Sequence, residues 1–265
     1  MARSKAVAKK EAAGVPALAG RMQKDARRGH ATRPEDLAIP FIGVLQDLSP
    51  QIKKREAKHI EGAEVGDIFN SVTNELWKGD EGIIVIPCAF EAKYVEWVPR
   101  AKGGGFVQAH DIESDIMQRT ERAEVENGFV DKLPNGNEVL LTAYHYVLVL
   151  DDDGNATRAM VAMAKTALKK SRAWNTMISN IQLDDGQGGK FNPPSFGYTY
   201  RLKAGEESNA MNAWFNWVIE SQGLVEYEHL YDQAESFAAA IEKGDVNRQY
   251  AGVDGAEDKT DNEKI

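Results

Sequence analysis

The hydrophobic residues in the middle of the chain recur with the spacing of β-strands. Residues 83–86 form a short β-branched run between Gly82 and Pro87, which predicts a buried strand. Residues 138–150 are apolar on both faces and follow a strong turn signal at 133–137, which predicts a central strand. The other predicted strands lie at 68–72, 90–98, 159–163 and 198–203.

Helical periodicity marks three further segments, which lie at 165–181, 208–221 and 230–243. In the first of them Lys165, Lys169 and Arg172 recur at i, i+4 and i+7 and therefore share one face. Strands joined by hairpins, one helix inserted late and helices at the C-terminus indicate an α+β fold. We expect a curved antiparallel β-sheet or a small barrel.

Charge is distributed very unevenly along the 265 residues, whose formal net charge is -9. Residues 1–33 carry nine Lys/Arg against two acids, a net of +7, whereas residues 204–265 carry four against 14, a net of −10. We therefore expect a disordered basic head at 1–33 and a disordered acidic tail at 251–265. Between them we place a folded core at 34–203 and C-terminal helices at 204–250.

Several protein classes are excluded by what the sequence lacks. Cys88 is the only cysteine, so the chain forms no internal disulfide and no cysteine-based zinc site. No apolar run has the length of a membrane span, and no apolar segment follows the basic residues 1–10, so we expect a cytoplasmic protein. The calcium-loop pattern fails at 151–162, and the histidines are scattered. We expect no enzyme activity, no metal and no cofactor.

The densest basic cluster of the predicted core lies in the helix at 165–181. It contains four cations and no acid between Lys165 and Asn175. Such a helix face suits contacts to phosphate, with Ser171 and Asn175 adding neutral hydrogen bonds. The alternative is a solvated helix face with its tryptophan in the core. The candidate DNA-contacting residues here are Lys165, Lys169, Lys170, Arg172 and Trp174.

A second candidate cluster joins aromatic and basic residues at the end of the strand 90–98. Base–aromatic stacking tolerates any sequence, and nearby cations hold phosphates. By strand parity Tyr94 and Trp97 face opposite sides, so at most one of them is a stacking platform and the other belongs to the core. The candidates in this cluster are Lys93, Tyr94, Trp97, Arg100, Lys102 and Phe106.

The curved strands, the Lys-Lys-Ser-Arg-x-Trp-Asn helix and the acidic run 254–263 together resemble bacteriophage-type single-stranded DNA-binding proteins. The resemblance implies an oligonucleotide/oligosaccharide-binding (OB-like) core over 40–203 and non-catalytic, sequence-independent binding of single-stranded DNA in replication or recombination. It also implies that the tail 251–265 recruits replication and recombination proteins and competes with DNA for the basic groove. The chain departs from the family pattern in two ways. Its tail contains Lys259 and Lys264 and ends in Ile265 with no aromatic residue near the end, and the family pattern does not require the basic head 1–33.

The alternative function is that of a virion-associated or assembly protein. The predicted helix 208–221 would present an apolar patch to a partner or to another copy of the chain, which would make a homo-oligomer. Packing of the same patch on the sheet is the simpler structural interpretation. The patch consists of Met211, Trp214, Phe215, Trp217, Val218 and Ile219.

Overall fold

The structure is a computed structural model that describes residues 20–22, 24–25, 28–29, 38–125, 128–210, 212–244 and 246. The chain divides into two compact units, Met1–Leu37 and Ala38–Ile265. In the first unit the guanidinium of Arg28 forms an ion pair with Asp25 at 2.9 Å. Most of the predicted basic head and all of the predicted acidic tail lie outside the described residues.

Two long antiparallel strands form the centre of the second unit. β4 (Ile83–Trp97) pairs along its whole length with β8 (Glu138–Leu150), and β8 pairs on its other side with β9 (Ala156–Ala164). Residues 83–86 and 90–98 were predicted as separate segments, but β4 runs through Pro87 as one strand. The register shifts between Pro87 and Ala89, and such a bulge accommodates a residue that has no backbone N–H.

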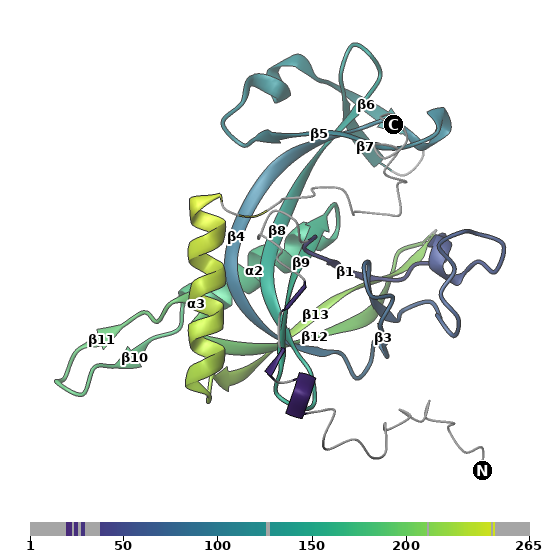
Figure 1. The fold of residues 1–265 in the computed structure, drawn as a ribbon. Coiled ribbons are helices and arrows are strands. Elements are labelled where there is room, and N and C mark those ends of the chain that lie inside the picture. The colour runs from purple at the N-terminus through teal and green to yellow at the C-terminus, as the bar shows by residue number, and fades with distance from the viewer. Residues whose placement is uncertain are drawn as a thin grey trace. The chain divides into compact units, whose positions relative to one another are not determined.

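The sheet continues on both sides of this centre and curls strongly into a half-barrel (Figure 1). The strand order is β13-β12-β4-β8-β9-β1-β2-β3, and β1 is parallel to β9. The bounds are β1 Phe41–Val44, β2 Ile68–Asn70, β3 Leu76–Trp77, β12 Tyr198–Ser208 and β13 Ala213–Leu224.

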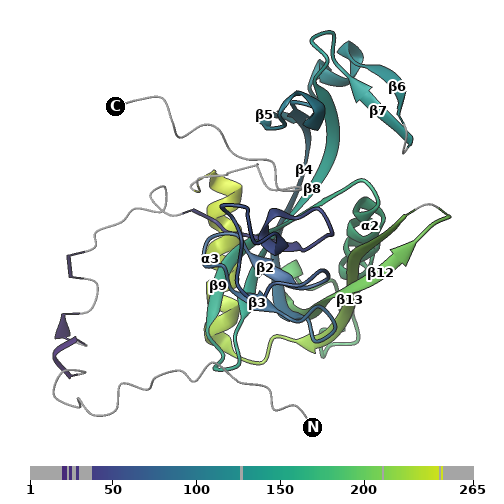
Figure 2. The same cartoon turned by 90° about the vertical axis from the view of Figure 1, so that its right-hand side faces the viewer.

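β4 and β8 extend beyond the half-barrel into a small outer lobe (Figure 2). There β5 (Phe106–Asp111) pairs with β4, and β7 (Gly128–Lys132) pairs with β8 and with β6 (Glu121–Val125). The lobe has its own apolar cluster of Ile116, Leu133 and Val139. Its short 3-10 helices are η3 (Arg100–Lys102) and η4 (Asp115–Arg119).

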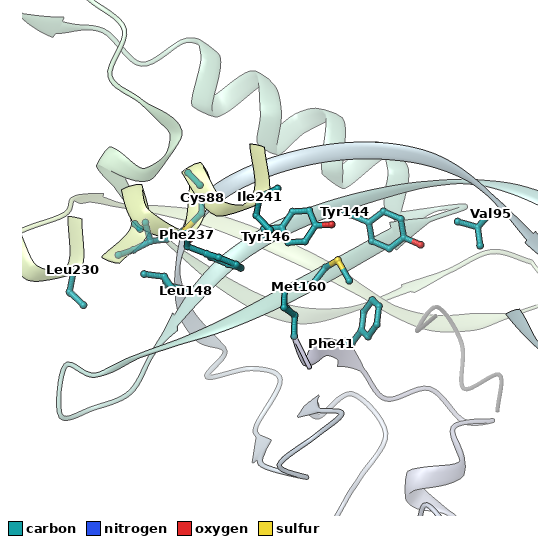
Figure 3. Close-up of a cluster of buried hydrophobic side chains, with 14 of the residues drawn as sticks. Phe41, Cys88, Val95, Tyr144, Tyr146, Leu148, Met160, Leu230, Phe237 and Ile241 are labelled. Atoms are coloured by element: carbon teal, nitrogen blue, oxygen red, sulfur yellow. The ribbon is translucent and has the colours of Figure 1, made fainter. Parts of the chain in front are cut away.

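Two helices cover opposite faces of the half-barrel (Figure 2). α3 (Glu228–Lys243) packs on the face that carries Tyr146 and Leu148, where Phe237 meets Tyr146 edge to face at 6.2 Å (Figure 3). α2 (Ala167–Ser179) inserts Trp174 into the cluster on the other face. Alternation along β8 explains this, because adjacent residues of a strand point to opposite faces.

Four shorter elements complete this unit. η2 (Pro50–Ile52) lies in the loop between β1 and β2. β10 (Leu183–Asp184) and β11 (Lys190–Phe191) form a small separate hairpin after α2. η5 (Ser195–Gly197) precedes β12.

The predicted α+β class, the curved antiparallel sheet and the inserted basic helix are confirmed. The predicted helix at 208–221 is wrong, because Ser208 ends β12 and Ala213–Leu224 is strand β13. Trp217 and Ile219 lie across from Ala204 and Leu202 and point with them into the core. The segment alternates aromatic and β-branched residues toward the sheet interior, which is a strand pattern. The C-terminal region is therefore a hairpin followed by one helix. Of the predicted apolar patch, Trp217 is buried and Ile219 packs beside it, whereas Val218 is exposed and Met211 lies outside the described residues.

No helix within the described part of the chain is both long and apolar enough to cross a membrane.

Candidate nucleic-acid interface

The basic helix α2 is held on the sheet by a contact between neutral buried groups. The His145 ring on β8 stacks on Trp174 with their centroids 4.5 Å apart, and Trp174 meets Tyr200 at 5.7 Å. A hydrogen bond of 2.8 Å joins His145 Nε2 to Ser171 Oγ. Ser171 and Trp174 are both buried, so this face of α2 belongs to the core and the opposite face is free to carry charge.

Burial determines the charge of His145. Loss of solvent lowers the pKa of this imidazole to about 3, so the ring is neutral at physiological pH. A protonated ring at this position would be a further buried cation beneath a helix that already carries Lys169, Lys170 and Arg172. The uncharged ring therefore lets the helix dock without adding repulsion.

The outer side of α2 and its approach form a hollow lined with cations. Lys165 has a left-handed backbone (φ 52°), uncommon for a residue other than glycine, where the chain turns from β9 into α2. Lys165, Lys169 and Arg172 are exposed, and Lys170 is half-buried. The hollow has a volume of about 380 Å³ and is lined by Lys165, Thr166, Leu168, Lys169, Lys170, Arg172 and Glu207.

The carboxylate of Glu207 on β12 lies in this hollow and is bound by several donors. Lys170 Nζ forms an ion pair with it at 2.7 Å, Asn216 Nδ2 donates at 2.7 Å and Trp214 Nε1 donates at 3.2 Å. The hydrogen bond from Lys170, followed by the one from Asn216, lowers the pKa of Glu207. These donors therefore bind a negatively charged oxygen of the protein itself, and a phosphate oxygen carries the same kind of charge.

Two other cations of the hollow, Lys169 and Arg172, are not neutralised in this way. Among the described residues, neither the ammonium of Lys169 nor the guanidinium of Arg172 takes part in an ion pair. Charged groups left without counter-ions on one helix face repel each other, and an anionic ligand would remove that repulsion. Of the basic residues predicted from the sequence, the four that the structure brings together in one hollow are Lys165, Lys169, Lys170 and Arg172.

Trp174 does not belong to this interface. Its side chain is fully buried between His145 and Tyr200, so it cannot stack on a base while α2 stays on the sheet. Ser171 is likewise committed to His145 and is not available to phosphate. The alternative interpretation of this helix, which places its tryptophan in the core, is therefore correct for Trp174.

The structure shows an aromatic residue beside α2 that the sequence did not single out. Phe90 on β4 pairs with His145 on β8, and their ring centroids lie 5.0 Å apart. Phe90 remains 48% exposed, whereas His145 beneath it is buried. Strand parity places Phe90 on the same face as Tyr94 but does not say what lies beside it. Its pairing with His145, which stacks on Trp174, brings Phe90 close to the basic helix.

The second predicted cluster is spread over β4, η3 and β5 and does not form one positive surface. The ammonium of Lys93 pairs with Asp111, and Glu91 lies 3.8 Å away. Tyr94 packs on the apolar cluster of the outer lobe. Trp97 is only 7% exposed and meets the Phe106 ring edge-on at 5.9 Å. The two aromatics do face opposite sides, but packing occupies both, which removes Trp97 as a stacking platform.

A buried carboxylate on β4, that of Glu96, binds the turn between β7 and β8 and one residue of β5. Asn137 Nδ2 donates to Glu96 at 2.5 Å, and His110 Nε2 and Asn135 Nδ2 lie at 3.2 and 3.4 Å. Burial raises the pKa of Glu96, but these hydrogen bonds outweigh it and the pKa is lowered overall. Arg100 is placed by its backbone in η3, and Lys102 is exposed beside Gly136. The Glu96 network holds the turn 133–137 and β5 on β4, and its partners among the described side chains are Asn135, Asn137 and His110 rather than Lys102.

A second basic segment lies in the loop between β1 and β2, and its run of charged residues could have been found in the sequence. Residues 53–58 contain four cations and one acid, and all six side chains are exposed. The cations are Lys53, Lys54, Arg55 and Lys58.

Metal ligands do not gather at either cluster. Within the described ranges, no group of three or more His, Cys, Asp or Glu side chains is arranged to hold a metal ion. Cys88 is buried, and burial raises the pKa of its thiol to about 12.

Comparison with known proteins supplies a family. Residues 8–247 match the family model of the Pam3 phage gp34-like protein, a span that covers most of the chain. The chain belongs to this phage protein family. No curated protein and no solved structure matches this Pam3 phage gp34-like chain. The family name carries no biochemical activity, so the function must be argued from the site.

Replacing His145 tests the contact that holds α2. An unfolded histidine titrates near pKa ~6.5, whereas the folded one binds a proton only near 3. The unfolded state therefore takes up more protons than the folded state between these two pKa values. The contribution of His145 to the free energy of unfolding is complete above pH ~6.5 and falls as the pH decreases. We expect the wild type to lose roughly 2 kcal/mol of unfolding free energy between pH 7 and 5 from this group, as measured by urea unfolding.

His145→Gln should have a flatter pH profile over this range, whatever its stability at pH 7. The exposed His229 provides the control, since His229→Gln should keep the wild-type slope. Equal slopes for His145→Gln and the wild type would contradict a buried, neutral His145.

Proposed function

We propose that this phage protein binds single-stranded DNA without catalysis and without sequence preference, in replication or recombination. The observation that carries the proposal is the cation-lined hollow on α2, where the protein's own Glu207 already occupies an oxyanion position. Phosphate groups of a DNA strand would meet Lys165, Lys169 and Arg172 in the same hollow.

The chemistry of these side chains suits a phosphate backbone. Lysine ammonium groups act as point charges, and the Arg172 guanidinium can bind two phosphate oxygens at once. Contacts of this kind release counter-ions from the strand and carry no information about base sequence. Sequence-independent binding follows from a site that offers cations and no set of base-edge donors.

Phe90 would supply the stacking that a basic face alone lacks. It is exposed next to the ring that seats α2, and the π-face of any base can stack on it. A strand lying along α2 with one base on Phe90 would use groups from two elements that the His145 contact fixes relative to each other. The tail 251–265 remains the proposed contact for replication and recombination proteins.

Removing two free cations should weaken binding in a salt-dependent way. For single strands the slope of log K against log salt is about −0.7 for each neutralised phosphate. Lys169→Gln with Arg172→Gln should therefore reduce the slope for oligo(dT) by about 1.4, measured by fluorescence anisotropy. Arg119→Gln with Lys243→Gln removes the same charge from η4 and α3 and should leave the slope unchanged.

The proposed binding function would be refuted if the wild type gave no anisotropy change with oligo(dT) at low salt. A wild type that binds, with equal slopes for the two double variants, would place the DNA away from α2.

Phe90→Ala should weaken oligo(dT) binding independently of salt. Losing one stacked base costs about 1–3 kcal/mol, which corresponds to an affinity lower by roughly 5- to 150-fold. Phe129 is 61% exposed in the outer lobe, so Phe129→Ala is the matched control and should bind like the wild type. If both variants bind equally well, Phe90 does not contact the bases.

A further inference from the structure

Buried residues and backbone hydrogen bonds hold the two ends of the exposed basic segment 53–58. Gln51 and Ile60 are buried at the two ends of the segment, and the Ile60 N–H donates to the Gln51 carbonyl at 2.9 Å. Inside it the Glu56 N–H donates to the Lys53 carbonyl at 2.9 Å. The turn therefore presents its cations in a fixed arrangement.

The cations of this segment are not used in ion pairs that stabilise the described part of the chain. Among the described residues, Lys53, Lys54, Arg55 and Lys58 form no ion pair, and Glu56 is the one acid between them. Like charges held within a short turn repel each other and contribute nothing to folding. A polyanion is the class of ligand that would turn this arrangement into a favourable one.

Hydrogen bonds, strand pairing and an ion pair connect the loop that carries this segment to the hollow on α2, through one end of the β12–β13 hairpin. Before the segment, Gln46 Nε2 donates to the Phe215 carbonyl at 2.9 Å, and the Phe215 N–H donates to Gln46 Oε1 at 3.0 Å. Trp214, the residue before Phe215, pairs across the hairpin with Glu207. Glu207 in turn holds Lys170 of α2.

The two basic segments therefore flank the same end of the hairpin. Gln46 contacts β13 and Lys170 contacts β12, and neighbouring strands such as these lie about 4.8 Å apart. Gly66, near the other end of the loop that contains η2, also lies against the Phe215 ring, so both ends of this loop contact β13. A single extended strand of nucleic acid is long enough to reach both basic segments.

We propose that residues 53–58 form a second phosphate-binding segment, so that a DNA strand bound on α2 continues over the end of the β12–β13 hairpin onto Lys53, Lys54, Arg55 and Lys58. This inference rests on the proposed function and adds the direction in which the strand runs. It also makes binding depend on length, because a short oligonucleotide reaches only one of the two basic segments.

The test compares Lys53→Gln with Lys54→Gln against the control pair Arg119→Gln with Lys243→Gln in the full chain. Each pair removes two exposed positive charges, and thermal melting confirms that both variants fold. With an oligo(dT) of about 30 nucleotides, well above a site of ~4–16 nucleotides per domain, the first pair should reduce the salt slope by about 1.4. The control pair should not change the slope.

With an oligo(dT) of about 6 nucleotides, within the range of one such site, the first pair should have a smaller effect than with the long one. Equal slopes for the two pairs on the long oligonucleotide would overturn the second segment while leaving binding at α2 intact. No binding by the wild type would instead refute the proposed function itself, so the two failures are distinguishable.

Discussion

The contact that seats α2 on the sheet brings together the buried imidazole of His145, the Trp174 ring and the Ser171 hydroxyl. All three groups are uncharged, since burial keeps His145 neutral. The helix can therefore press one face into the core while its other face gathers cations. The Phe90 ring contacts the same imidazole, with their centroids 5.0 Å apart. One buried ring thus contacts both the helix that carries the cations and the exposed aromatic residue on β4.

The net charge of -9 conceals a local arrangement of the opposite sign. Free charges interact over a Debye length of about 8 Å at physiological salt, so a distant acid has little influence on a phosphate held at α2. What matters there is the local balance of Lys165, Lys169, Lys170 and Arg172 against Glu207. An acidic chain can therefore bind a polyanion through one surface, at the cost of strong dependence on salt.

The sequence predicted β2, β4, β8, β9, β12 and the basic helix, because these depend on local periodicity. It did not predict β1, β3 or the strands β5, β6 and β7 of the outer lobe. It failed at 208–221, where Trp217 and Ile219 alternate toward the core in a short segment that also fits helical spacing. The fate of individual aromatics could not be predicted, since Trp174 and Phe90 differ only in what packs over them. Tertiary pairing decided that Phe90 lies beside α2. The basic run at 53–58, by contrast, was readable in the sequence and needed only the Gln46 contact to gain a position.

Hydrogen–deuterium exchange on the full chain, with and without saturating oligo(dT), tests most directly whether DNA lies on α2. If it does, backbone amides of residues 165–179 should exchange more slowly in the complex, because a bound strand suppresses local opening of the helix. Residues 121–132 of the outer lobe should exchange at the same rate in both states. Slower exchange confined to the outer lobe, with α2 unchanged, would contradict the proposed interface.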